Sequence, residues 1–330
     1  MAARLISGFF KLVLVGLATA GLFALALAGM IAVPVTKPPP LAFISDTVRT
    51  ADREGIPPLL YVQARDGSQL GYRHYAPRGP AAGRATILIH GSSGSSVAMH
   101  PLAKALAARG VESFVPDIRG HGVSGTRGDI GYLGQLEDDL ADLVGHLRGS
   151  APDLPLTLVG HSSGGGFALR VAGSPVQGLF ARTVLLSPFL GHTAVSTRPN
   201  AGGWASPDLP RIIAIYILRS FRIVCCDQLP VIAFAVPANS AKILTAEYSF
   251  RLLTNFSANR DYREDLRAAK GPLTLIAGAN DELMFAGKYQ EAVAGTAANI
   301  DVRILDNANH MDVVSTAATL PAVVEDIATR

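Results

Sequence analysis

The residues best suited to chemistry form the pentapeptide Gly-His-Ser-Ser-Gly at 160–164, which directly follows the apolar run Leu156–Val159. A buried strand that turns sharply through Gly-x-Ser-x-Gly into a helix lifts the middle serine hydroxyl above the carboxyl end of a sheet. The two glycines let neighbouring backbone approach without a clash. In a chain with 33 glycines, this pentapeptide alone also fits a glycine-rich turn with an incidental serine. The apolar strand before it is what favours the elbow. We predict that Ser162 is a nucleophile.

A serine hydroxyl needs a base, and the base needs a group that orients it. In this type of strand–turn–helix elbow, the acid and then the histidine follow the serine along the chain. Asp281 follows the apolar run 273–277 and His310 follows the run 302–305, so both belong to loops at the carboxyl ends of strands. The sequence therefore predicts His310 as the general base and Asp281 as its orienting carboxylate. Three other carboxylates are less well placed for that role, namely Glu282, Asp306 and Asp312.

The tetrahedral intermediate of acyl transfer also needs hydrogen-bond donors for its oxyanion. One donor should be the backbone N–H of Ser163, the residue after the nucleophile. The other should come from the loop after the apolar run 85–90, and we choose the backbone N–H of Ser92, with Ser93 as the alternative.

Around these residues, short apolar runs alternate with helical patterns. Residues 59–64 and 69–75 read as a hairpin around the turn Arg-Asp-Gly-Ser. Such a hairpin followed by strand–helix repeats predicts an α/β fold with a mostly parallel sheet and helices on both faces. Further strands are expected at 85–90, 111–116, 156–159, 183–186, 273–277 and 302–305, and helices at 98–109, 133–147, 164–171, 285–294 and 311–328.

The stretch between about residues 188 and 255 interrupts this rhythm, because it contains no clean strand–helix unit. It includes the apolar, arginine-containing segment 211–223 and the run 231–236, and its charge-free runs are too short to span a membrane. We interpret the insertion as a lid over the active site. The alternative is a packed subdomain with no role toward the substrate.

The N-terminal residues predict a membrane anchor. Leu12–Thr36 contains no charged residue and exceeds the about 20 residues that a spanning helix needs. Arg4 and Lys11 precede it, which favours a cytoplasmic N-terminus and an extracytoplasmic catalytic domain. The alternative is a cleaved signal peptide and a secreted product, because small residues at 24–28 resemble a cleavage site. We divide the chain into an anchor at 1–36, a proline-containing linker at 37–58 and a catalytic domain at 59–330.

Composition limits the remaining functions. A formal charge of +3 without a dense basic patch gives no reason to expect nucleic acid as a partner. The two cysteines, Cys225 and Cys226, are adjacent and provide no metal-ligand spacing, and neighbouring cysteines rarely pair. We expect them to be two small apolar residues, and we expect no metal or other cofactor. The sequence leaves the oligomeric state open.

Several motifs together resemble those of the α/β-hydrolase superfamily. They are His90-Gly91, the stretch Asp-Ile-Arg-Gly-His-Gly-Val-Ser at 117–124, the pentapeptide at 160–164, Asp281 and His310. The 117–124 stretch is similar to the branch that contains monoglyceride lipases, lysophospholipases and serine aminopeptidases. The resemblance implies an eight-stranded sheet with a lid after the sixth strand and no cofactor. We assign His121 to loop architecture and His161 to packing beside the elbow.

These observations predict a membrane-anchored serine hydrolase that cleaves carboxylic esters through an acyl-enzyme. Lipid-like esters such as monoacylglycerols or lysophospholipids are the leading substrates, because an apolar lid would lie beside a membrane anchor. The same triad could serve an acyltransferase or a serine peptidase. A non-catalytic binding protein on the same fold is the alternative from another class. Dehalogenases and epoxide hydrolases are disfavoured because they need a carboxylate where this chain has Ser162.

Overall fold

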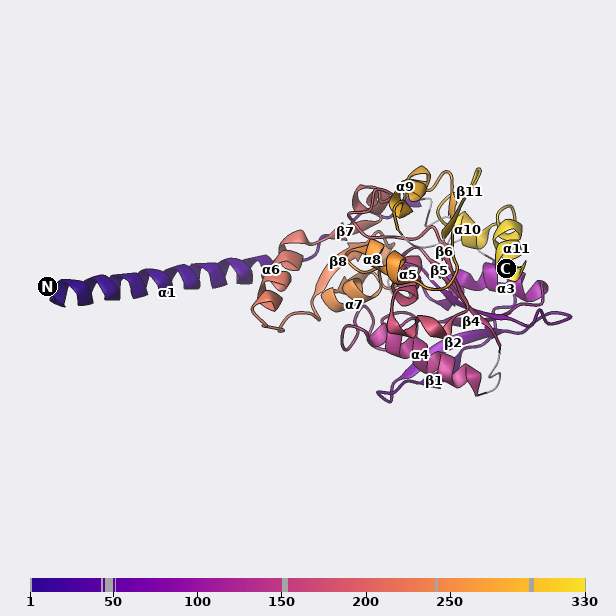
Figure 1. Cartoon of the computed structure of the whole chain (residues 1–330), viewed down its shortest axis with the longest axis horizontal. Helices are drawn as coiled ribbons and strands as arrows, with labels where there is room; N and C mark the ends of the chain where they lie inside the picture. Colours follow the sequence, from indigo (N-terminus) through magenta and orange to yellow (C-terminus); the bar gives the residue numbers. More distant parts are fainter. Residues whose placement is uncertain are drawn as a thin grey trace.

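The computed structural model describes residues 2–42, 44, 50, 52–149, 154–240, 243–296 and 300–329. A single long helix, α1 (Ala2–Ala32), projects from an α/β body, and its inner end meets the body at helix α6 (Figure 1). Residues 34–40 follow α1 without regular secondary structure. Of the linker expected at 37–58, residues 43, 45–49 and 51 lie outside the described part.

An eight-stranded sheet forms the centre of the body, in the order β1-β2-β4-β3-β5-β6-β10-β11. The first two strands form the expected hairpin, β2 is also antiparallel to β4, and the remaining neighbours are parallel. The predicted fold class is therefore confirmed. The strands are β1 (Leu60–Gln63), β2 (Gln69–Tyr75), β3 (Ala85–Ile89), β4 (Glu112–Pro116), β5 (Leu156–His161), β6 (Arg182–Leu186), β10 (Leu273–Gly278) and β11 (Ile300–Leu305).

Alternate residues of the central strands face two separate hydrophobic clusters. In β3, Ile87 and Ile89 belong to one cluster while Leu88 belongs to the other, and Leu158 and Val159 of β5 divide in the same way. All five residues of β3 are buried, because helices cover both faces of a parallel sheet. Helices α4 (Gln135–Arg148), α5 (Ser163–Ala172), α8 (Tyr262–Ala268) and α9 (Tyr289–Val293) contribute to the first cluster; α3 (His100–Ala108), α10 (Asp312–Ser315) and α11 (Leu320–Thr329) contribute to the second.

The helix boundaries follow local sequence chemistry. Helix α4 begins after Gly134, whose φ of 96° is readily adopted by glycine. Acidic side chains occupy its first turn and basic ones its last, which complements the helix dipole. The expected helix at 311–328 is instead two helices, α10 and α11, which the segment 316–319 separates. Short 3-10 helices lie at Ser96–Met99, Pro175–Leu179, Pro199–Gly203, Ala238–Ser240 and Ala286–Lys288.

The insertion at 188–255 folds around a second sheet, which the sequence did not predict. Its three strands are antiparallel and lie in the order β7-β8-β9. Asp208 accepts a hydrogen bond from the Arg211 amide and so caps the helix that follows β7. The elements are β7 (Ala205–Pro207), α6 (Leu209–Ser220), β8 (Pro230–Phe234), β9 (Glu247–Ser249) and α7 (Phe250–Asn255).

The expectation for the two cysteines was wrong. Cys225 and Cys226, in the loop after α6, are joined by a disulfide between adjacent residues. Their Cα atoms lie 3.8 Å apart, below the usual spacing across such a bond, which is why the sequence argued against the pairing.

Close backbone packing at the carboxyl end of β10 yields a stability prediction. A Cβ atom on Gly278 would lie 2.3 Å from the carbonyl oxygen of Ala308, in the loop that carries His310. We expect Gly278→Ala to lower the free energy of unfolding by about 1–3 kcal/mol, because backbone atoms must move to relieve the overlap. Gly145→Ala is the matched control: Gly145 lies on α4 with no atom within 4 Å of such a Cβ, so alanine should stabilise the helix. Denaturant unfolding in detergent measures both, and equal midpoints would contradict the prediction.

Candidate active site

Ser162 lies in the sharp turn between β5 and α5. Its φ of 56° and ψ of −119° are strained for a residue with a side chain, and its amide donates to the carbonyl oxygen of Leu186 at 2.9 Å. Neither flanking glycine has room for a side chain. A Cβ on Gly160 would lie 2.1 Å from the carbonyl oxygen of Gly164, and a Cβ on Gly164 would lie 2.3 Å from the carbonyl oxygen of His90. This is the backbone of a nucleophile elbow, with Ser162 at its apex.

The imidazole of His310 is bound to Asp281. Nδ1 of His310 lies 2.8 Å from Oδ2 of Asp281, and both side chains are buried. Because an ionised carboxylate only accepts, Nδ1 carries a proton, which in the neutral ring leaves the lone pair on Nε2. The other oxygen of Asp281 accepts the amides of Leu283 and Met284 at 2.9 and 2.8 Å. This arrangement can orient a general base.

The same contacts keep Asp281 ionised. Burial by itself raises the pKa of its carboxyl group, but the interaction with His310 and the hydrogen bonds from His310 and the Met284 amide lower it more. The net pKa of Asp281 is therefore below its ordinary value. Of the other carboxylates considered, Glu282 accepts the backbone amide of His310 at 2.9 Å and Asp306 is exposed. Asp281 is thus the carboxylate that contacts the ring.

His161 connects the elbow to the histidine loop. It directly precedes Ser162, its Nε2 donates to the carbonyl oxygen of His310 at 3.1 Å, and the two histidine rings are 4.8 Å apart. Burial and then the nearby His310 lower the pKa of His161 to about 3, so its imidazole is neutral. Among the hydrogen bonds of the described residues, there is none between Ser162 Oγ and His310. Catalytic contacts of this kind often tighten only when substrate is bound.

The loop at 90–94 passes directly beside Ser162, because a Cβ on Gly91 would lie 3.1 Å from the Cβ of Ser162. The amide of Ser93, the alternative oxyanion donor, is already occupied: it donates to Tyr248 Oη at 2.8 Å. In the part of the chain that the structure describes, the amides of Ser92 and Ser163 bind no other protein group. Those two amides are therefore available to a ligand.

Sequence reasoning missed two aromatic residues of the insertion that contact this loop. Tyr248 binds the Ser93 amide, and Nε1 of Trp204 donates to Ser92 Oγ at 2.8 Å. Neither residue belongs to a local motif. The one available signal was that Trp204 is the only tryptophan in the chain.

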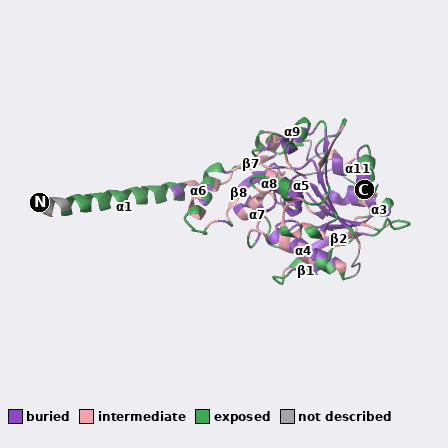
Figure 2. Ribbon diagram, in the orientation of Figure 1, coloured by how far each residue is buried: buried purple, intermediate pink, exposed green. Residues whose placement is uncertain are grey.

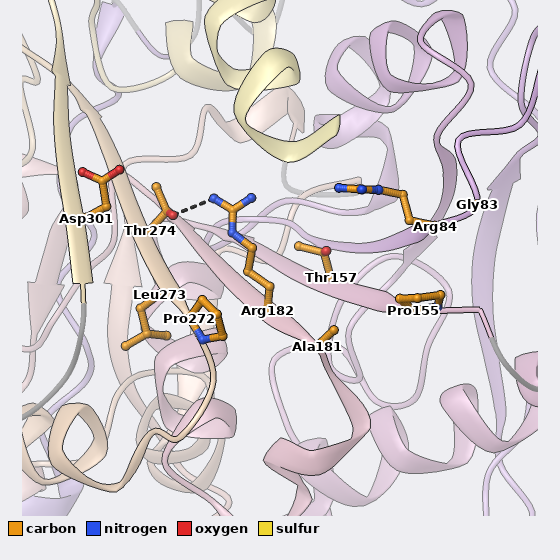
Figure 3. A pocket seen from close by; sticks show the side chains of 10 residues that line it. All are labelled: Gly83, Arg84, Pro155, Thr157, Ala181, Arg182, Pro272, Leu273, Thr274 and Asp301. Carbon is orange, nitrogen blue, oxygen red and sulfur yellow. Dashed lines mark hydrogen bonds between the residues drawn. The ribbon is translucent and has the colours of Figure 1, made fainter. Parts of the chain in front are cut away.

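A cavity of about 480 Å³ lies at the opposite edge of the sheet, where the strands begin (Figure 3). Arg182 lines it, but its guanidinium donates to Thr274 Oγ1 at 2.6 Å and pairs with Asp326, so the fold already uses that charge. This edge is remote from Ser162, which follows the carboxyl end of β5. Among the described residues, no cluster of three or more His, Cys, Asp or Glu side chains could hold a metal ion.

The fold and the elbow define an α/β-hydrolase, and comparisons with known proteins agree. The family described as "Serine aminopeptidase, S33" matches residues 81–313. A monoacylglycerol lipase of Mycolicibacterium smegmatis is 33% identical over 33% of this chain and 40% of its own length. Human monoglyceride lipase is 33% identical over 38% of this chain and 41% of its own. The chain thus matches less than half the length of either relative.

A solved structure extends the likeness of fold over nearly the whole body. A soluble variant of monoglyceride lipase from Saccharomyces cerevisiae, in complex with a substrate analog, superposes with a TM-score of 0.63 and 19% identity. The match covers 84% of this chain and 94% of that one. The chain belongs to the S33 serine aminopeptidase family, has the α/β-hydrolase fold, and is similar over part of its length to monoglyceride lipases.

The contact between Asp281 and His310 yields a test of the site. We expect Asp281→Asn to lower kcat for ester hydrolysis on the order of 10⁴-fold, because an amide favours the wrong imidazole tautomer. Asp306→Asn, an exposed carboxylate after β11, is the control and should leave kcat unchanged. Steady-state kinetics with a p-nitrophenyl ester measure both. A similar small effect of the two substitutions would exclude Asp281 as the orienting carboxylate.

Proposed function

We propose that the protein is a serine hydrolase that cleaves carboxylic esters through an acyl-enzyme. The observation that carries this proposal is the 2.8 Å contact between His310 and Asp281, at the sheet edge where Ser162 is held at the apex of the elbow. Ser162 is the nucleophile, His310 the general base and Asp281 its orienting partner. The amides of Ser92 and Ser163 form the oxyanion hole.

The reaction follows from these roles. Ser162 Oγ attacks the ester carbonyl carbon while His310 Nε2 takes the hydroxyl proton, and the amides of Ser92 and Ser163 stabilise the oxyanion. When the intermediate collapses, the ester C–O bond breaks and the leaving alcohol takes the proton from His310. Water, activated by His310, then attacks the acyl-enzyme and releases the carboxylic acid and Ser162.

Lipid-like esters, either monoacylglycerols or lysophospholipids, are the substrates that we propose. Two relatives named as monoacylglycerol or monoglyceride lipases support this class. The apolar insertion beside the membrane helix supports it as well, because such a surface suits an acyl chain.

We also propose that residues 1–36 anchor the protein as a single-pass membrane protein, with the linker 37–58 and the catalytic domain 59–330 on the extracytoplasmic side. Within the described residues, Ile6–Ala32 forms a helix long and apolar enough to cross a bilayer. Arg4 and Lys11, before and near the start of this span, support a cytoplasmic N-terminus. Secretion after signal cleavage is the competing topology.

Active-site labelling tests the nucleophile. We expect a fluorophosphonate probe to label the wild-type protein and to leave Ser162→Ala unlabelled, because the probe forms its bond to an activated serine oxygen. Ser257 is a partly buried serine just after α7 whose hydroxyl donates to the Leu253 carbonyl, and Ser257→Ala should label like wild type. An unlabelled wild type, or equal labelling of Ser162→Ala, contradicts the proposal.

In the same preparations, p-nitrophenyl esters of increasing chain length test the substrate class, and a preference for acetyl esters would exclude the lipid-like class.

A further inference from the structure

The end of α1 is fixed against α6 of the insertion. Nε of Arg211 donates to the carbonyl oxygen of Ile31 at 2.9 Å, and its Nη2 donates to that of Val33. A helix leaves its last carbonyl groups without partners inside the helix, and a cation at that end also complements the dipole. Arg211 is buried. Leu27, near the same end of α1, is buried as well. Figure 2 shows this buried segment where the otherwise exposed α1 meets α6.

The outer side of this junction is apolar and exposed. Leu209, Ile213 and Tyr216 are spaced as neighbours on one helical face and are 58%, 49% and 45% exposed. The loop after α6 adds three more exposed apolar residues, Phe221, Ile223 and Val224. We call these six residues the α6 face. The segment 209–226 contains three arginines and no acidic residue.

We propose that the α6 face docks into the surface of the membrane that α1 spans, among the lipid headgroups and upper acyl chains. The inference rests on the proposed anchor. Because Arg211 ties the last turn of the spanning helix to α6, α6 lies where the chain leaves the bilayer (Figure 1). An apolar helical face with a cation beside it is the composition of helices that lie in the membrane interface. The exposed Arg222 supplies that cation, since Arg211 binds the end of α1 and Arg219 pairs with Asp227. The lid therefore contacts lipid directly.

The protein offers a matched pair of tyrosines for a test by fluorescence quenching. Tyr216 is part of the α6 face, whereas Tyr61 on β1 is 53% exposed on a distant part of the body. The only native tryptophan, Trp204, is buried and supplies the background emission. Full-length Tyr216→Trp and Tyr61→Trp are reconstituted in phosphatidylcholine vesicles with and without brominated acyl chains. We expect brominated lipid to remove most of the added emission of Tyr216→Trp and to leave that of Tyr61→Trp unchanged.

The outcomes separate the docked surface from the anchor. One outcome is that the protein stays with membranes after a carbonate wash while Tyr216→Trp is not quenched. The anchor then stands and the docking proposal is wrong, because the α6 face is free or contacts a second copy of the chain. If the wash releases the protein, the anchor itself is wrong. Arg211→Met keeps the apolar stem but loses the bonds to Ile31 and Val33. It should reduce quenching of Tyr216→Trp, and unchanged quenching would overturn the role of Arg211.

An independent set of contacts joins the insertion to the loop at 90–94, which carries the proposed oxyanion donor Ser92 and which we call the oxyanion loop. Tyr248, buried on β9, accepts the Ser93 amide at 2.8 Å and lies 2.6 Å from Nε2 of His121. Nδ1 of His121 donates to the carbonyl oxygen of Ile118 at 3.2 Å, so Nε2 accepts a hydrogen bond from the Tyr248 hydroxyl. Burial, and then the neighbouring His90, lower the pKa of His121 and keep the ring neutral. The Thr245 amide also donates to the Ser93 carbonyl oxygen at 3.0 Å.

These bonds hold a strained backbone. Ser93 has a φ of 64°, a left-handed conformation that is unfavourable for a residue with a side chain and persists only where the surroundings impose it. We infer that Tyr248 is a positioning residue: its hydroxyl fixes the peptide group of Ser93 and, through it, the Ser92 amide proposed as an oxyanion donor. This inference rests on the proposed hydrolase function.

Removal of one hydroxyl tests this role. Tyr248→Phe keeps the ring that packs against Phe234 at 4.6 Å. We expect kcat to fall by roughly 10–100-fold, somewhat less than the loss of an oxyanion donor itself, with little change in KM, because the oxyanion forms only in the transition state. Tyr262→Phe is the matched control: this buried hydroxyl donates to the Ala292 carbonyl at 2.9 Å, away from Ser162. Tyr262→Phe should lower the thermal midpoint by about as much as Tyr248→Phe does and should leave kcat unchanged.

The rate of fluorophosphonate labelling distinguishes the two levels of failure. If the wild type labels at Ser162 and Tyr248→Phe labels at the same rate with the same kcat, the positioning role is wrong while the hydrolase proposal stands. A change in KM alone, or equal losses of kcat in Tyr248→Phe and Tyr262→Phe, also overturns it. A wild type that does not label removes the hydrolase proposal itself.

Discussion

The structure depends on how closely the backbone approaches itself at the carboxyl edge of the central sheet. Gly160 lets the end of β5 approach the start of α5, Gly164 lets the elbow pass the end of β3 and His90, and Gly278 lets the end of β10 pass the loop that carries His310. These contacts leave no room for a Cβ atom. They also hold Ser162 in a strained conformation, which persists because β5 and α5 fix both sides of the turn. Backbone packing therefore sets the site before any side chain contributes.

The hydrogen-bond partner distinguishes the histidines around this edge. Desolvation lowers the pKa of His90, His121 and His161, and each of these rings has hydrogen bonds to backbone groups. His310 is equally buried, yet its Nδ1 contacts the carboxylate of Asp281. A carboxylate partner stabilises the charge that a general base acquires, whereas a carbonyl partner does so only weakly. The environment thus suits one ring to proton transfer and the other three to architecture.

The central sheet could be predicted because each strand is a short apolar run between turn residues, and that pattern is local. Ser162, Asp281 and His310 could be placed together for the same reason, since parallel strands end at a common edge. The sheet β7–β9 could not be predicted, because two of its strands have only three residues each. The contacts of Tyr248 were also hidden, since its partners lie 155 and 127 residues away in the sequence.

That small sheet connects two distant parts of the molecule. Arg211, which binds the end of α1, also donates to the carbonyl oxygen of Pro230 at the start of β8. Strand β8 pairs with β9, where Ile232 is opposite Tyr248, and Tyr248 binds the Ser93 amide in the loop beside Ser162. Only two hydrogen-bonded strands therefore separate α1 from the loop at 90–94. The end of α1 and residues 92–93 are therefore joined by a continuous series of hydrogen bonds through the small sheet.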